Sequence, residues 1–248
     1  MEDKLIIYLH AHDLTRPSFV IFSKEGVAET VVHGDAERLA DLCRDKDVIV
    51  IVPASDVVLM SALLPKMNRA KLLKALPFAL EDHLVDDVET LHFATTEQPV
   101  DGRFPVAIVA REKIETWLSL LKSWGVTPYC MTPSTLALRR QESAWTIAAD
   151  DTAAVRLNGY QGFAADLSTL SSMLNLAMVE GNAVPSSIRL LNASSAEISL
   201  RVTAQLNEEK MSQSQLYEMI AREFDVLDTI NLLQGAYLIK RRYLIPPK

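Results

Sequence analysis

The feature that most restricts the fold is an uninterrupted apolar run, DVIVIVP, at residues 47–53. Its β-branched residues favour an extended strand. Apolar residues with no polar residues between them indicate a strand whose two faces are both buried, as in the interior of a sheet covered by helices. The run therefore predicts an α/β fold with a central strand at this position.

Predicted strands and helices follow one order twice along the chain: three strands, a helix and a further strand. The second set begins near residue 145, which predicts two related α/β units with mixed sheets. Hairpin turns are predicted at Lys24-Glu25-Gly26, Asp101-Gly102 and Asn158-Gly159. Besides the central run, the predicted strands are 5–10, 19–23, 27–32, 57–65, 91–98, 104–110, 126–132, 145–149, 153–157, 160–166, 186–192 and 198–203.

The clearest helical pattern covers residues 111–124, where apolar residues recur at helical spacing and Gly125 stands where a C-terminal cap belongs. Residues 68–84 begin with the capping residue Asn68 but contain Pro77, which predicts a kink or a break. Further helices are predicted at 37–44, from Asp166 to about Glu180 with Gly181 at the end, and after a capping box formed by Ser212 and Gln215.

Composition and charge argue against several classes of function. The net charge is −7 and basic residues do not alternate with aromatic ones, so we expect no nucleic-acid partner. Cys43 and Cys130 lie far apart without ligand spacing, which indicates free thiols in a reducing compartment. The N-terminus lacks the features of a signal peptide, and no stretch approaches the roughly 18 apolar residues of a membrane span. These features predict a soluble, cytoplasmic chain.

The last nine residues, KRRYLIPPK, are basic and contain no acid. A basic cluster of this kind is either a solvated tail or the cytoplasmic flank of a membrane span under the positive-inside rule. The sequence alone favours the tail.

Signatures of known catalytic sites, such as a P-loop, a nucleophile elbow or HExxH, are absent. His10 and His12 alternate along a predicted strand and share a face, but a third ligand is missing, so we interpret them as ordinary strand histidines rather than metal ligands. Asp150 and Asp151 stand between two strands, where they form a turn or hold Mg²⁺ near a phosphate.

A separate acidic stretch lies between residues 81 and 89. Three interpretations fit it: a solvated face, a weak cation site, or a landing patch for a basic partner. Its spacing fits no known metal-binding loop, which disfavours the cation. The stretch consists of Glu81, Asp82, Asp86, Asp87 and Glu89.

Several segments together resemble the cytoplasmic domain of the type II secretion system protein L family. They are residues 75–94, 106–128, 133–138 and 230–237, the last reading INLLQGAY, and they follow the order and spacing of that family. The resemblance implies an actin-like ATPase fold, made of two RNase H-like halves with a small subdomain between them. It implies units at 1–97, 98–143 (the small inserted α/β subdomain) and 144–248.

The same resemblance implies an inner-membrane assembly platform on the cytoplasmic face of the bacterial inner membrane, with a membrane span and a periplasmic domain beyond residue 248. It moves the interpretation of KRRYLIPPK from tail to membrane-proximal segment. The implied partners are the N-terminal domain of the secretion ATPase, the M protein of the same platform and a second copy of the chain. The acidic stretch is the candidate contact for the ATPase, chosen on charge complementarity alone.

Nucleotide-binding relatives of this fold hold phosphates with backbone N–H groups in glycine-containing turns, because glycine permits a close approach. The corresponding turns here, 10–18 and 149–153, contain no glycine, and Pro17 removes a donor. We therefore expect a degenerate nucleotide site, no cofactor and no enzymatic activity. The alternatives are an actin-like ATPase or sugar kinase that uses Asp150 and Asp151, and an ATP-binding platform protein of type IV pili.

Overall fold

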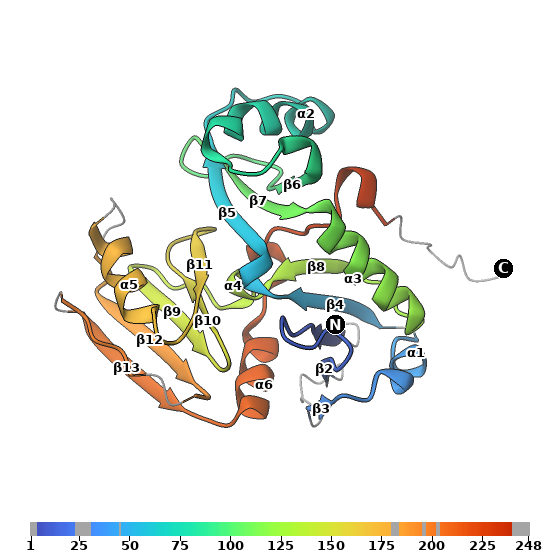
Figure 1. Cartoon of the computed structure of the whole chain (residues 1–248), viewed down its shortest axis with the longest axis vertical. Helices are drawn as coiled ribbons and strands as arrows, with labels where there is room; N and C mark the ends of the chain where they lie inside the picture. The colour runs from blue at the N-terminus through green and yellow to red at the C-terminus, as the bar shows by residue number, and fades with distance from the viewer. Residues whose placement is uncertain are drawn as a thin grey trace.

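Three β-sheets organise the computed structural model, which describes residues 4–22, 31–44, 46–179, 184–194, 197–201 and 204–239. Two five-stranded sheets lie next to each other, and a three-stranded sheet lies beyond them at the top of Figure 1. The mixed sheets and their covering helices make this an α/β fold. The loop Lys24-Glu25-Gly26, most of the predicted strand at 27–32, the helix end at Glu180 and Gly181, and KRRYLIPPK lie outside the described residues.

The first half is built on the sheet β3-β2-β1-β4-β8. The strand predicted from the apolar run is β4, which lies between β1 and β8 and is parallel to both. Its residues Val48 to Val52 are at most 2% exposed, which confirms that both faces are buried. The strands are β1 (Lys4–Tyr8), β2 (Ser18–Phe22), β3 (Val32–His33), β4 (Asp47–Val52) and β8 (Cys130–Pro133).

The second half repeats this topology in the sheet β11-β10-β9-β12-β13. In both sheets two antiparallel pairs are followed by two parallel pairs, so the predicted internal repetition is confirmed at the level of strand order. The hairpin between β10 and β11 contains Asn158-Gly159, with Gly159 at φ +48°. The strands are β9 (Ala144–Ala149), β10 (Ala153–Arg156), β11 (Gly162–Ala165), β12 (Ser187–Asn192) and β13 (Gln205–Lys210).

The small sheet β5-β7-β6 consists of β5 (Val57–Ala62), β7 (Phe104–Ala110) and β6 (Leu91–Thr95). Helix α2 (Arg69–Leu80) packs on it through Leu72, Leu76 and Leu80. The three-unit division at 97 and 143 stays a prediction, and the sheets group the strands differently. The boundary at 97 falls inside the β6–β7 hairpin, whose strands pair along five residues.

The other helices follow their sequence signals closely. In α6 (Gln213–Glu223) both hydrogen bonds of the predicted capping box are present. Helix α3 (Arg111–Ser123) ends before Gly125, which has φ +71°. Helix α2 continues through Pro77 to Leu80 instead of breaking there. The remaining elements are α1 (Leu39–Leu42), α4 (Ser134–Ala137), α5 (Leu170–Val179), and the 3₁₀ turns η1 (Ala36–Arg38), η2 (Ala54–Asp56), η3 (Glu81–His83), η4 (Val88–Thr90), η5 (Val226–Asp228) and η6 (Gly235–Tyr237).

Two strand predictions are wrong. The strand predicted at 198–203 is absent over its described residues 198–201, and the outer strand β13 forms a few residues later from the polar segment QLNEEK. Strand β1 ends at Tyr8, so His10 and His12 lie in the following turn rather than on a strand. The chain leaves the sheet here after a last hydrogen bond from Leu9 N–H to the Ile51 carbonyl (2.9 Å).

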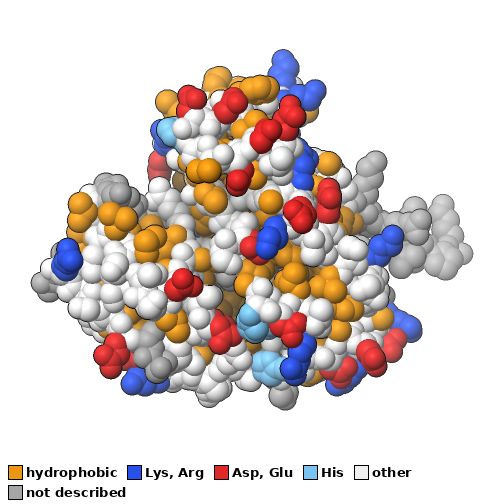
Figure 2. Space-filling model, viewed as in Figure 1, with side chains coloured by type: hydrophobic (Ala, Val, Ile, Leu, Met, Phe, Trp, Pro, Cys, Tyr) orange, Lys and Arg blue, Asp and Glu red, His pale blue; other side chains and the backbone are white. Residues whose placement is uncertain are grey.

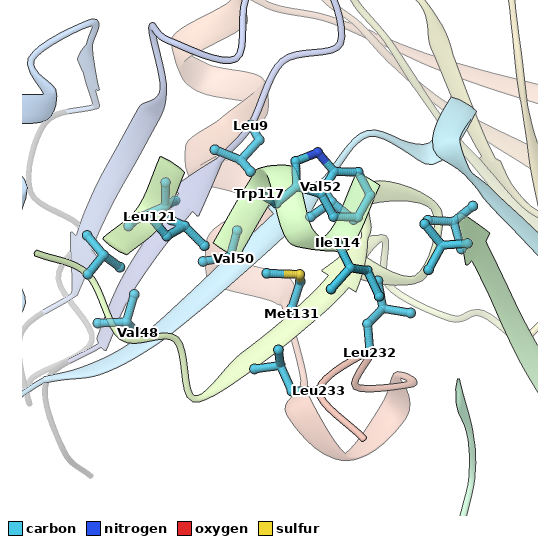
Figure 3. Close-up of a cluster of buried hydrophobic side chains, with 14 of the residues drawn as sticks. Leu9, Val48, Val50, Val52, Ile114, Trp117, Leu121, Met131, Leu232 and Leu233 are labelled. Carbon is cyan, nitrogen blue, oxygen red and sulfur yellow. The ribbon is translucent and has the colours of Figure 1, made fainter. Parts of the chain in front are cut away.

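The core of the first half contains residues from distant parts of the chain. Helix α3 places Ile114, Trp117 and Leu121 against the buried face of β4 and against Met131 of β8. Leu232 and Leu233, near the end of the described chain, enter the same cluster (Figure 3). Fully burying one such side chain stabilises the fold by roughly 1.5–3 kcal/mol. Within the described part of the chain, no helix combines the length and apolar character that crossing a bilayer demands.

Candidate functional site

A narrow cleft separates the two halves where the chain turns after β1 and between β9 and β10. The family resemblance predicts that these two turns are the counterparts of the phosphate loops of nucleotide-binding proteins with this fold. The cavity between them encloses about 80 Å³. A further hollow of about 360 Å³ opens on its histidine side, between residues 10–18 and Gln213. Ligand pockets for small molecules usually hold about 300–1,000 Å³, and the cavity at the two turns is by itself smaller than that range.

Several backbone donors of the two turns are used within the turns themselves. Asp150 N–H donates to the Thr152 carbonyl (3.0 Å), and Thr152 N–H donates to the Asp150 carboxylate (3.3 Å). In the other turn, Thr15 N–H donates to the Asp13 carboxylate (3.0 Å). A phosphate cradle needs these N–H groups to be available, and the carboxylates add negative charge that repels an anion. Asp150 and Asp151 thus lie in a turn, as one of the two interpretations of the sequence expected.

A row of polar side chains joins the two halves beside this cavity. Ser214 of α6 bonds to His33 of β3 (2.9 Å), and His33 bonds to Ser18 of β2 (2.7 Å). Ser18 bonds in turn to His10 (2.9 Å). The hydroxyl of Tyr217 on α6 lies 3.4 Å from His10 Nδ1 and donates to a carboxylate oxygen of the β9–β10 turn (2.8 Å). Figure 2 shows histidine and acidic side chains gathered between the two halves.

Burial governs the ionisation of His10 and of Tyr217 in this row. Burial lowers the pKa of His10, and the nearby Asp150 carboxylate opposes that effect. Burial, followed by the charge of Asp150, raises the pKa of Tyr217 far above its ordinary value. Tyr8 stacks on Tyr217 with ring centroids 4.7 Å apart and donates to its backbone carbonyl (2.6 Å). Both phenols therefore remain protonated at neutral pH and act as hydrogen-bond donors.

The two histidines singled out from the sequence lie close together, with ring centroids 5.7 Å apart. His12 Nδ1 lies 3.5 Å from a carboxylate oxygen of Asp151, and both side chains are largely exposed. In the described ranges, no three histidine, cysteine or acidic side chains are arranged to hold a metal ion.

The acidic stretch lies away from the cleft, on the unit built from the small sheet and α2. We call this unit the small subdomain; its strands β5 and β6 lie outside the predicted range 98–143. Its five carboxylates are exposed, and they flank the exposed apolar side chains Phe78 (78%) and Val85 (102%). Asp87 accepts from Glu89 N–H (2.9 Å) and so caps η4. Acidic and apolar side chains also alternate over the upper part of Figure 2. The arrangement presents a mixed acidic and apolar surface, with no convergence of the carboxylates on one point.

Residues 229–239 form an extended segment that we call the strap. Its Leu232 N–H donates to the Met131 carbonyl of β8 (2.7 Å), and the Asn231 side chain accepts from Met131 N–H (3.0 Å). On the other side, the Leu232 carbonyl bonds to the His92 ring of β6 (2.8 Å). The Gln234 side chain donates to the Thr95 carbonyl (2.9 Å). The strap therefore ties the edge of the first sheet to the small sheet.

Sequence reasoning missed most of these contacts. The INLLQGAY segment stands out only through the family resemblance. Its three apolar residues at 230, 232 and 233 follow neither a helical nor a strand period, so they do not indicate where the segment packs. Sequence reasoning also missed Ser18, His33, Ser214 and Tyr217. The one available signal was the spacing of Ser214 and Tyr217, which lie three residues apart on a predicted helix and therefore share a face.

Comparison with known proteins gives a consistent result. The family model for the type II secretion system protein L matches residues 5–240. A type II secretion system protein L of Dickeya chrysanthemi is 34% identical over 149 residues, covering 58% of this chain and 37% of that protein. The protein of the same name from Vibrio cholerae serotype O1 is 27% identical over 228 residues, covering 91% of this chain and 53% of that protein. The chain thus covers between 37% and 53% of the length of these two relatives.

Solved structures support the same fold. The cytoplasmic domain of EpsL, an inner-membrane component of the type II secretion system of Vibrio cholerae, matches with a TM-score of 0.79 at 24% identity, over 95% of this chain and 99% of that chain. A PilM–PilN type IV pilus biogenesis complex matches with a TM-score of 0.60 at 14% identity, over 89% and 95%. A Bacteroides thetaiotaomicron protein with an actin-like ATPase fold matches with a TM-score of 0.51 at 11% identity, over 88% and 95%. The predicted actin-like α/β fold is confirmed.

Proposed function

The chain belongs to the type II secretion system protein L family, and from this premise we propose that it is the cytoplasmic part of an inner-membrane assembly platform. The observation that carries the proposal is the match of the family model to residues 5–240. The platform recruits the secretion ATPase to the cytoplasmic face of the inner membrane and links it to the rest of the secretion machinery. A membrane span beyond residue 248 anchors it.

The contact for the N-terminal domain of the ATPase lies, in this proposal, on the small subdomain. The acidic stretch and the exposed Phe78 and Val85 supply acidic and apolar side chains that are open to a partner. Interfaces of standard size bury about 1,600 Å² in total and have an apolar core with a polar rim. A partner with basic residues around an apolar patch complements this surface.

The link to the other platform components runs through the strap. The strap is fixed to two sheets by backbone and side-chain hydrogen bonds, and it is the last described segment before the membrane-proximal residues. In this proposal, a displacement of the ATPase bound to the small subdomain is transmitted through the strap to the membrane-proximal chain. The further partners in this proposal are the M protein of the same machinery and a second copy of the chain.

We do not assign catalysis to the domain. The cavity between the two turns holds about 80 Å³, several of the turn donors are used internally, and neither turn contains a glycine that would allow a phosphate to approach. These features favour a scaffold that keeps the actin-like architecture without its nucleotide chemistry.

The proposal is tested by calorimetric titration of the N-terminal domain of the cognate secretion ATPase into the chain. We expect saturable binding, weakened at least tenfold by the combined substitutions Glu81→Gln, Asp82→Asn and Asp86→Asn. The matched control changes three exposed acids of the first half, Glu37→Gln, Asp41→Asn and Glu112→Gln, and keeps the affinity. No binding by the parent chain contradicts the docking role, and equal loss in both triple variants contradicts the assigned surface.

A second candidate function is an ATP-binding platform like those of type IV pili, favoured by the structural likeness to the PilM–PilN complex. Titration of the chain with ATP and Mg²⁺ separates the two. Heat of saturable binding that disappears with Asp151→Ala supports the second candidate, and the absence of binding supports the scaffold.

A further inference from the structure

Helix α5 of the second half carries no charged side chain and is apolar on two faces. Its inner face packs into the core of the second half through Leu170, Leu174, Ala177 and Met178. Its outer face exposes Met173 (37%), Leu176 (47%) and Val179 (79%). Side chains three residues apart are neighbours on a helix, so these three form a continuous row, which we call the α5 ridge. Hydrophobic side chains lie along the left edge of Figure 2, where Figure 1 places α5.

A row of this kind is normally covered by a partner. In globular proteins a helix that is apolar on all sides is buried, and exposed apolar side chains that lie together mark interaction sites. Two of the polar side chains of α5, Ser171 and Asn175, are turned to one flank of the helix, where they bond to a neighbouring segment. They therefore do not interrupt the ridge.

The segment on that flank is extended and runs alongside α5 from Glu197 to Arg201. Near the beginning of the helix, Ser171 Oγ accepts from Ser199 N–H (3.0 Å). Further along, the Asn175 side chain donates to the Ser199 carbonyl (3.0 Å) and accepts from Arg201 N–H (2.7 Å). The segment thus runs in the same direction as the helix, so that Glu197 lies near the start of α5 and Arg201 lies near its second half.

The two ends of this segment carry opposite charges. Glu197 and Arg201 are exposed, whereas Ile198 and Leu200 between them pack against the core of the second half. In the part of the chain that the structure describes, no ion pair involves either charge. The ridge is therefore flanked on one side by an acid at one end and a base about 13 Å further along, at the rise of an extended chain.

These charges determine how two copies of α5 can meet. Copies related by a twofold axis present the same surface to each other. When the two helices run antiparallel, their flanking segments lie on the same side of the pair and also run antiparallel. Glu197 of one copy then faces Arg201 of the second copy, and symmetry forms the same pair again. The axis passes between Met173 and Leu176, so each Met173 packs on Leu176 of the other copy.

Other arrangements and occupants fit less well. When the two helices run parallel, the flanking segments lie on opposite sides of the pair and neither charge gains a partner. A helix that lies on a membrane surface carries Lys and Arg beside its apolar face, and α5 carries neither. In Figure 1, α5 also lies on the opposite side of the molecule from the last described residues of the strap. A second copy of the chain supplies both the apolar row and the complementary charges.

We propose that the α5 ridge is a self-association surface, on which a second copy of the chain packs antiparallel with two reciprocal Glu197–Arg201 ion pairs. The inference names the surface for the second copy and so rests on that part of the proposed function. Three apolar side chains from each copy form an interface of the small class, below about 1,200 Å², which is weak between free molecules. Anchoring of both copies in one membrane raises their effective concentration.

Sedimentation equilibrium of the chain at low salt tests the surface. We expect a reversible dimer with a dissociation constant on the order of 100 µM. Leu176→Asp buries a carboxylate in the middle of the ridge and should weaken the dimer by about tenfold or more. Leu227→Asp changes another exposed apolar side chain (85%), on η5, and should keep the parental affinity. A parent chain that stays monomeric up to about 1 mM overturns the proposal, as does a dimer that Leu176→Asp leaves intact.

The antiparallel geometry is tested by exchanging the two charges. Glu197→Arg alone and Arg201→Glu alone each place like charges opposite one another, so each should weaken the dimer by about threefold or more. The double variant reverses the ion pair and should restore the parental affinity. Effects that add up in the double variant reject the antiparallel pairing. Both residues are exposed, so these changes leave the core intact.

Titration of the N-terminal domain of the ATPase into the same variants separates this inference from the docking role. We expect Leu176→Asp to bind that domain as the parent chain does. A parent chain that binds the ATPase domain but does not dimerise overturns the α5 surface and leaves the docking role in place. A chain that dimerises through α5 but does not bind the ATPase domain supports the surface and contradicts the docking role.

Discussion

At the residue scale, Arg156 connects more separate segments than a single strand residue normally does. Its side chain is 2% exposed and donates to the carbonyls of Leu136, Leu138 and Gly159. It also donates to the Asp228 carbonyl and forms an ion pair with that residue's carboxylate (3.1 Å). Burial lowers the pKa of Arg156, and the Asp228 charge offsets part of this. One guanidinium thus joins the start of the second half, a hairpin turn and η5.

Replacing Arg156 by methionine tests this role. The substitution leaves several carbonyls without a donor and removes the closer of the two cations at the Asp228 carboxylate, and breaking a buried pair typically costs about 3–5 kcal/mol. We expect a loss of that size in the free energy of unfolding, measured with urea. The control is Arg140→Met, which removes a half-exposed partner of the same carboxylate (3.6 Å) and costs at most about 1 kcal/mol. Similar losses in both variants would show that burial of Arg156 does not decide its effect.

Gly162 is required for a different reason. A Cβ atom there would lie 2.2 Å from the Val155 carbonyl oxygen and 2.4 Å from Thr135 Cγ2. The Val155 oxygen belongs to the backbone of β10 and cannot move without distorting that strand, so Gly162→Ala must push β11 away from β10 and α4. We expect a loss of at least 2 kcal/mol, roughly the scale of overpacking in a core. Gly102→Ala is the comparison: it has open space and φ +78°, so backbone strain alone should cost about 1 kcal/mol. Equal thermal unfolding midpoints in the two variants would contradict the close approach.

At the scale of elements, local patterns predicted those parts of the fold whose interactions are local. The buried run became β4, and the capping box at Ser212 started α6, because both signals depend on neighbours in sequence. Strand β13 was missed because its side chains are polar, and only pairing with β12 makes QLNEEK a strand. The strap was missed for a similar reason, because its partners on β8 and β6 are 100 or more residues away. The row of polar side chains was missed because two of its bonds, His33 to Ser214 and His10 to Tyr217, join residues that are still further apart.

The strap yields a prediction at this scale. Leu232 is fully buried in the core of the first half, so Leu232→Ala leaves a cavity and should cost about 2–5 kcal/mol. Hydrogen exchange should rise in both β8 and β6, because the strap bonds to both. Leu238→Ala, at a side chain that is 62% exposed, should change neither stability nor exchange. Faster exchange confined to the strap itself would mean that it does not connect the two sheets.

At the scale of the whole molecule, acidification should weaken the fold. Burial lowers the pKa of His10 and of His92, which also bonds to the strap. The unfolded chain therefore binds more protons than the folded chain below the ordinary histidine pKa of about 6.5. The free energy of unfolding should be constant above that value and decrease as the pH falls towards about 5. The decrease is about 1.4 kcal/mol for each unit by which the pKa of a histidine in the folded chain lies below its pKa in the unfolded chain.

Urea unfolding over this range, in parent and variants, checks the sign. His92→Gln keeps a donor for the Leu232 carbonyl but does not titrate, so it should remove part of the decline and leave the part due to His10. His83→Gln, at an exposed site, should have no effect. Stability that increases on acidification would contradict the lowered pKa values.

The strap also determines when the molecule can fold. During synthesis N-terminal domains usually fold first, as independent units. Here the core of the N-terminal half includes Ile230, Leu232 and Leu233, which a ribosome adds only after more than two hundred other residues. The first half therefore emerges with an unfilled groove and an unpaired edge at β8. It waits for residues 230–233, and this makes the two halves one unit of co-translational assembly despite their internal repetition.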